Sequence, residues 1–365
     1  MAIYDVSANA LAAAYDSGGV SLAYAYDVEG TEIFSVTPTP PVYPMDWTNM
    51  TAYLKQGIDS IVAYAQAYVS AHSGAYAFPV ITDVHDSFYN EPNYIIYNFP
   101  TAFDKFLFLG DIATAYSQTQ MDNAVTYMEE ANLCDILALV GNHELGNWAE
   151  GDTLPKVWYQ EIIPESCTLM ADTDALVYYW DDDDNNVRFI CLDSCTPIYK
   201  QSGTQLYTKN ELEFFASALD SSGTKDIILL NHAPGQSYYD VEDTEHTTTY
   251  STTGITNRGT LDSIIGAYIG RTSYTFSDDS SVSHTHDYSE MTGSFIGLIT
   301  GHTHHAGFQS GNGYNAYICP STRYKTDAGV SVFVVDKTAS KVIHLIAYRS
   351  QSEYGVYEYS YEVTP

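Results

Sequence analysis

The stretch ILALVGNHE, residues 136–144, decides how this chain is built. Its first five residues are apolar and too few for a helix, so they are typical of a buried β-strand. A glycine ends the run, and polar side chains of the metal-ligand type follow directly. The stretch therefore predicts a strand that delivers chemical groups at its carboxyl end.

Four other segments repeat this design. In α/β sheets, ligands bind beyond the carboxyl ends of the strands. Five such strands would bring their last residues to one edge of the sheet, and a series of five is hard to explain by capping or core packing alone. The other apolar runs are 78–81, leading to Asp83 and His85; 106–109, leading to Asp111; 227–230, leading to His232; and 295–299, leading to His302 and His304.

The residue types point to metal chemistry. Oxygen and imidazole ligands suit borderline divalent ions such as manganese, iron or zinc. Seven candidate ligands without a cysteine are too many for one tetrahedral zinc site, but suit two ions that share a carboxylate. Such pairs, about 3.5–4 Å apart, clamp a phosphoryl group and activate a water molecule. The seven candidates are Asp83, His85, Asp111, Asn142, His232, His302 and His304.

Together these motifs resemble the signature of the calcineurin-like metallophosphoesterase family. The resemblance covers about residues 76–350 and implies an α/β fold, a four-layer α/β/β/α sandwich, with a centre of two divalent ions. The motifs that carry it are Asp83-x-His85, Gly110-Asp111, Gly141-Asn142-His143-Glu144, His232 and Gly301-His302-x-His304.

The resemblance also implies a role for each residue. Asp83, His85 and His304 would hold the first ion, and Asn142, His232 and His302 the second. Asp111 would bridge the two ions. A hydroxide between the metals would attack phosphorus, Asn142 and His143 would contact the substrate, and His143 would act as general acid.

Two departures narrow this reading. The similar protein Ser/Thr phosphatases carry GDxxDRG and RGNHE, whose arginines hold phosphate, but here Thr114 replaces the second Asp and Val140 precedes GNHE. That subfamily is disfavoured, and the group that orients His143 stays open. His85 and Thr114 also stand where purple acid phosphatases have Gly and Tyr, so an iron–tyrosinate site is not expected.

Composition excludes several classes of partner. The 365 residues carry 14 Lys+Arg against 46 Asp+Glu, for a net charge of -32. Such a surface repels nucleic acid and anionic lipid, and no run reaches the roughly 20 apolar residues of a membrane span. No signal peptide is expected in this chain. Its 33 tyrosines and few lysines favour an extracellular or virion-associated location over the cytoplasm.

The chain divides into three predicted parts. Residues 1–36 repeat Tyr-Asp every 11 residues, which predicts short strands that form either a small β appendage or mobile arm, or a module for attachment or homo-oligomerisation. Residues 37–45 are a proline-rich linker. Residues 46–365 would form the metallophosphoesterase domain, with a helix over 46–72, hairpins over 176–192 and 330–349, and a polar insertion over 237–290. The five cysteines are expected to be buried free thiols.

Two functions follow from these patterns. The first is a metal-dependent hydrolase of phosphomonoesters or phosphodiesters. The alternative is a surface- or virion-tail-associated binding module that uses the same fold with little or no turnover. The tyrosine-rich composition and the N-terminal repeat favour the alternative, whereas the complete ligand series favours the hydrolase.

Overall fold

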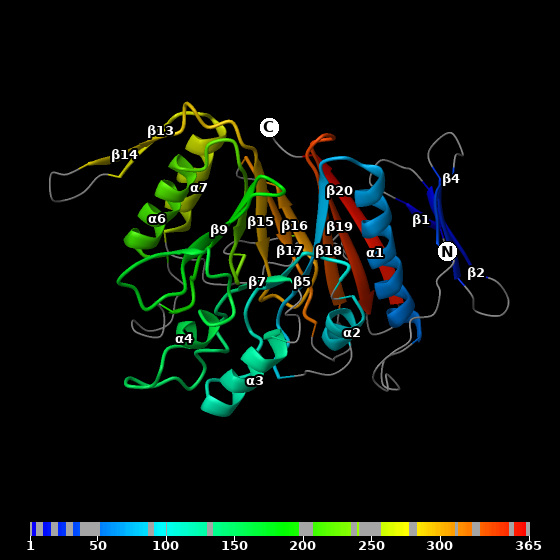
Figure 1. Cartoon of the computed structure of the whole chain (residues 1–365), viewed down its shortest axis with the longest axis horizontal. Helices are drawn as coiled ribbons and strands as arrows, with labels where there is room; N and C mark the ends of the chain where they lie inside the picture. Colours follow the sequence, from blue (N-terminus) through cyan, green and yellow to red (C-terminus); the bar gives the residue numbers. More distant parts are fainter. Residues whose placement is uncertain are drawn as a thin grey trace.

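The architecture was read from a computed structural model. It describes residues 2–4, 10–15, 21–26, 32–36, 52–86, 91–99, 101–129, 134–196, 207–234, 239–240, 257–276, 283–310, 313–322, 329–349 and 354–362. Two large sheets lie face to face at its centre, with helices on their outer sides (Figure 1).

The first large sheet has six strands in the order β20-β19-β18-β5-β6-β7. Strands β5, β6 and β7 are parallel, and β18, β19 and β20 extend the sheet by antiparallel pairing. The parallel strands are almost wholly apolar because both faces of the sheet are covered. Their bounds are Ala75–Ile81 for β5, Lys105–Phe108 for β6, Asp135–Ala138 for β7, Gly329–Asp336 for β18, Lys341–Arg349 for β19 and Tyr354–Glu362 for β20.

The second large sheet has eight strands in the order β12-β16-β17-β15-β11-β10-β9-β8. Its centre, β17-β15-β11-β10, is parallel, and β9 joins β10 in an antiparallel hairpin. The bounds are Thr168–Leu169 for β8, Tyr178–Asp182 for β9, Val187–Cys191 for β10, Asp226–Leu230 for β11, Tyr239–Asp240 for β12, Phe295–Thr300 for β15, Gly307–Ser310 for β16 and Asn315–Ile318 for β17.

Helices cover the outer faces of the two sheets. Helix α1 packs on β18, β19, β20 and β5, with Leu54, Ile58 and Ile61 buried at helical spacing. Helices α6 and α7 lie on the other sheet, and a capping box of Thr208 and Glu211 starts α6. The helices are α1 Ala52–Ala71, α2 Glu91–Asn98, α3 Gln118–Glu129, α4 Pro155–Tyr159, α6 Lys209–Asp220 and α7 Arg258–Ile269.

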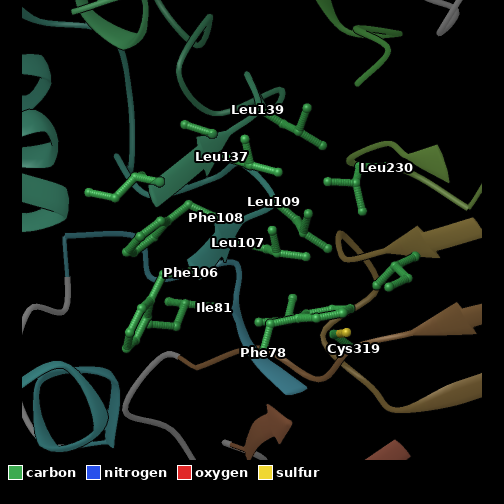
Figure 2. Close-up of a cluster of buried hydrophobic side chains, with 14 of the residues drawn as sticks. Phe78, Ile81, Phe106, Leu107, Phe108, Leu109, Leu137, Leu139, Leu230 and Cys319 are labelled. Carbon is green, nitrogen blue, oxygen red and sulfur yellow. The ribbon is translucent and has the colours of Figure 1, made fainter. Parts of the chain in front are cut away.

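The core between the sheets is aromatic. Phe78 of β5 meets Phe189 of β10 edge to face at 5.6 Å between ring centroids, and stacks on Phe333 of β18 at 5.7 Å. Figure 2 shows Phe78 near Cys319, with Leu107, Leu109 and the other buried chains of β6 and β7 alongside. Burying each such side chain stabilises the fold by about 1.5–3 kcal/mol.

Several predictions from the sequence are confirmed. The chain is α/β, and the two hairpins form as β9–β10 and β18–β19. All five cysteines are free thiols, but only Cys191, Cys195 and Cys319 are buried, whereas Cys134 and Cys167 are half-buried. Residues 1–36 contribute an antiparallel sheet of β1 Ala2–Tyr4, β2 Ala10–Tyr15, β3 Ser21–Tyr26 and β4 Glu32–Val36. Residues 37–45 lie outside the described residues. The domain boundaries stay a prediction. None of the helices described could cross a membrane.

Two expectations need correction. The range 237–290 is not simply a polar insertion, because α7 buries Leu261, Ile264 and Ile265 in the core beside α6. The five motif strands also do not share one sheet. Strands β5, β6 and β7 belong to the six-stranded sheet, and β11 and β15 to the eight-stranded one. Apolar runs identify buried strands but not their neighbours, which long-range pairing decides.

Candidate metal centre

The loops that follow the five motif strands are hydrogen-bonded to one another. The Asp83 amide donates to the Gly110 carbonyl at 3.0 Å, and the His85 amide to the Asp111 carbonyl at 3.0 Å. Across the sheets, the His302 amide donates to Oδ2 of Asp83 at 2.8 Å. The two sheets therefore deliver their polar residues to one place.

Five of the seven candidate ligands have left-handed backbone conformations. This region costs most non-glycine residues about 1–3 kcal/mol and persists where the surroundings impose it, often at functional sites. It is what allows residues two apart, such as Asp83 and His85, to turn toward the same point. The φ angles are 54° at Asp83, 50° at His85, 53° at Asp111, 71° at His302 and 67° at His304.

Two motif glycines are required by close approach. A Cβ at Gly141 would lie 2.2 Å from Oδ1 of Asp111, and a Cβ at Gly301 would lie 2.7 Å from Oδ2 of Asp83. Neither contact is sterically allowed. The glycines of GNHE and GHTH thus make room for the carboxylates of the neighbouring loops.

The first group of candidate ligands is Asp83, His85 and His304. Nε2 of His304 lies 3.2 Å from Oδ1 of Asp83 and 3.1 Å from Nε2 of His85. One ligand atom from each residue lies within 4.8 Å of the others. This is the set that the resemblance assigns to one ion.

The second group joins Asp111, His232 and His302, again with ligand atoms within 4.8 Å of one another. Nε2 of His232 lies 3.3 Å from Oδ2 of Asp111, 3.2 Å from Oδ1 of Asn142 and 3.2 Å from Nδ1 of His302. Oδ2 of Asp111 is also 4.0 Å from Nε2 of His85. Asp111 therefore stands between the two groups.

Hydrogen bonds, burial and nearby charge set the orientation and the protonation of the histidines among the candidate ligands. Nδ1 of His232 lies 2.6 Å from the Leu109 carbonyl, which can only accept, so Nε2 is left to face the centre. Burial would lower the pKa of His232, but the Asp111 carboxylate raises it to about 10. Burial lowers the pKa of His85 to about 4, and burial together with His232 does the same for His302. Neutral imidazole is the form that binds metal, so His85 and His302 are already in that form near neutral pH, whereas His232 would release a proton when an ion binds.

The donor set fits divalent metal ions. Asp83 is fully buried, and its Oδ1 has no hydrogen-bond partner among the residues that the structure describes, although Nε2 of His304 lies 3.2 Å away. A buried carboxylate oxygen without a donor is costly unless a cation supplies the missing partner. Oxygen and imidazole nitrogen are ligands for manganese, iron or zinc. The residues thus form candidate metal-binding groups.

His143 lies beside the two groups. Its side chain is 40% exposed, and its Nε2 is 4.0 Å from Oδ2 of Asp111. It also forms a third group of possible ligands with His85 and Asp111. Its Nδ1 lies 2.7 Å from the Thr114 carbonyl. The backbone of Thr114 therefore supplies the partner that the sequence left open.

Two supporting groups had no role predicted from the sequence. The buried Glu144 carboxylate accepts from the amides of Asp111, Ala113 and Gly141. Ser321 Oγ donates to the Asp83 carbonyl at 2.8 Å, from the loop after β17. The sequence could have identified Glu144, since this residue ends the GNHE motif. The Ser321 loop carries no such signal, because a short polar stretch does not identify its partner.

No family model and no curated protein matches this chain. Among solved structures, the chain is similar to vacuolar protein sorting 29 from Cryptosporidium parvum, with 10% identity over 79% of this chain and 98% of that one, TM-score 0.34. It is similar to an archaeal phosphodiesterase at 13% identity, 74% and 99% coverage, TM-score 0.32. It is also similar to Vps29 from Entamoeba histolytica complexed with zinc, at 10% identity, 78% and 98% coverage, TM-score 0.31.

These identities and TM-scores are low, so the site itself carries the functional argument. At this site, the ends of five strands from two sheets bring two groups of ligand atoms together around Asp111. In its motifs, in its α/β fold and in the placement of the residues that carry the motifs, the chain resembles the calcineurin-like metallophosphoesterases.

Proposed function

We propose that the chain is a phosphoesterase that hydrolyses phosphomonoesters or phosphodiesters with two divalent ions, manganese, iron or zinc. Asp83, His85 and His304 would hold one ion. The observation that supports the proposal most is the placement of Asp111 within reach of both ligand groups. When bound, a pair of ions would activate water and neutralise charge on the phosphoryl oxygens.

The second ion would be held by Asn142, His232 and His302, with Asp111 shared between the ions. The Leu109 carbonyl would keep Nε2 of His232 aimed at the metal. This arrangement leaves the exposed His143 as the residue that meets the substrate.

His143 would protonate the leaving oxygen, and Asn142 would help to place the phosphoryl group. The exposure of His143 leaves its ring accessible from solvent, and the Thr114 carbonyl orients its Nε2 toward Asp111. The same geometry would also permit His143 to act as a metal ligand. The two roles differ in how activity depends on the leaving group.

The first test is hydrolysis of a chromogenic phosphomonoester and its diester with manganese added. Asp111→Asn should abolish turnover, since the shared oxygen loses its charge. Asp172→Asn is the matched control, because Asp172 is exposed and also left-handed, with φ 52°. Equal turnover in wild type and Asp111→Asn would remove the proposal.

A binding role remains the second candidate, favoured by the separate N-terminal sheet β1–β4. As an attachment module outside the cell or on a virion, the chain would retain its function in Asp111→Asn. If the arm drives homo-oligomerisation, removal of residues 1–44 should reduce the mass in solution. The charge of -32 argues that no nucleic acid is bound.

A further inference from the structure

The orientation of His143 depends on a single peptide unit. Its Nδ1 donates to the Thr114 carbonyl at 2.7 Å, because a carbonyl can only accept. A carboxylate in this place would hold the ring by charge as well as by geometry. The neutral Thr114 carbonyl can only orient the His143 ring. The orientation of the ring therefore depends on the groups that hold this carbonyl in place.

The same peptide is held at its other end by Gln120. The amide N–H of Ala115 donates to Oε1 of Gln120 at 2.8 Å. The peptide bond is planar and trans, so the Thr114 carbonyl and the Ala115 N–H point in opposite directions. Fixing the N–H therefore fixes the direction of the carbonyl that accepts the hydrogen bond from Nδ1 of His143.

Gln120 is itself well placed for this task. It lies in the first turn of α3, where its own amide donates to Oγ of Ser117 at 3.2 Å. Its side chain is half-buried. The preceding peptide is held separately, since the Thr114 amide donates to Oδ2 of Asp86 at 3.1 Å. The loop is thus anchored on both sides of the carbonyl.

We propose that Gln120 is a positioning residue for His143, acting through the Thr114–Ala115 peptide. The inference rests on the proposed function. As the bond between phosphorus and the leaving oxygen breaks, that oxygen takes the proton from Nε2 of His143. The ring is left neutral, with its remaining proton on Nδ1 held by Thr114. Gln120 keeps Nε2, rather than Nδ1, facing the leaving oxygen.

The test compares Gln120→Ala with Gln120→Glu in the zinc-loaded full chain. Alanine removes the acceptor of the Ala115 N–H, whereas glutamate keeps an oxygen there. The substrates are two esters of the class the chain turns over, one with phenolate and one with 2,4-dinitrophenolate as leaving group. Gln118→Ala is the control, because Gln118 also lies in the first turn of α3 but is exposed, and its side-chain amide donates to Oδ1 of Asp122 at 2.8 Å.

Gln120→Ala should lower kcat for the phenyl ester by about tenfold, the effect of one lost hydrogen bond, with KM unchanged. The dinitrophenyl ester needs little protonation and should change by less than about twofold. Gln120→Glu and Gln118→Ala should resemble wild type. Equal loss on both esters, or no loss on either, would overturn the proposal.

A second readout is independent of turnover. Nitrogen chemical shifts of His143 in the zinc-loaded protein, recorded at a pH where the ring is neutral as it is after donating its proton, report which ring nitrogen carries the remaining proton. Wild type and Gln120→Glu should show the proton on Nδ1, and Gln120→Ala a mixture of both tautomers. An unchanged tautomer in Gln120→Ala contradicts the proposal even if no ester is hydrolysed, whereas absent turnover with a shifted tautomer contradicts only the proposed function.

Discussion

Glu144→Gln should destabilise the chain more than its small chemical change suggests. Glu144 is fully buried, and its two oxygens face four donors. Oε2 accepts from the amides of Asp111 at 2.8 Å and Gly141 at 2.7 Å. Oε1 accepts from the Ala113 amide at 2.9 Å and the Tyr159 hydroxyl at 3.0 Å.

The cost follows from this geometry. A glutamine has one oxygen, so its NH₂ must face two donors in either flip. In the better flip the Tyr159 hydroxyl turns to accept, and the Ala113 amide alone is left buried without a partner. That orphan costs about 1–3 kcal/mol, and the loss of charge weakens the other bonds. We expect about 3 kcal/mol in total.

Urea unfolding at 25 °C, followed by tryptophan fluorescence in the metal-free protein, measures the difference at constant m. Tyr159→Phe is the matched control, because it removes one donor but leaves the carboxylate, and should cost about 1 kcal/mol. A Glu144→Gln variant within about 0.5 kcal/mol of wild type would refute the reasoning. It would mean that Glu144 is already protonated, as burial and the Asp111 carboxylate favour by raising its pKa.

Three further outcomes are expected. Gly301→Ala places a Cβ 2.1 Å from Oγ1 of Thr82, so zinc binding by calorimetry should be lost, whereas Gly259→Ala, with no atom within 4 Å, should bind normally. Burial lowers the pKa of His344 to about 3, so below pH 6.5 this residue takes up a proton in the unfolded chain but not in the folded one. His344 should therefore contribute a loss of about 2 kcal/mol in the free energy of unfolding from pH 7 to 5, and urea titrations of His344→Gln should show a loss smaller by that amount than wild type. Zinc should raise the melting temperature of wild type, and Asp83→Asn should abolish most of that rise, because the ion binds only the folded state; an equal rise in both would place the zinc elsewhere.

The strand ends and candidate ligands could be predicted because their signal is local. An apolar run followed by glycine and a polar residue, as at Leu109 and Asp111, needs no information from the rest of the chain. Hairpins such as β9–β10 were predictable for the same reason. The core position of α7 was not, because the apolar residues of 257–276 stand in a stretch dominated by Ser, Thr and Tyr.

The sequence by itself determined the α/β class, the five motif strands and the chemical identity of every candidate ligand. Only the tertiary structure decided that the strands belong to two sheets, and that the backbone of Thr114, held by Gln120, orients His143. The reason is physical. The bond from the His302 amide to Asp83 joins residues 219 positions apart, and contacts of that kind form only when the whole chain has folded.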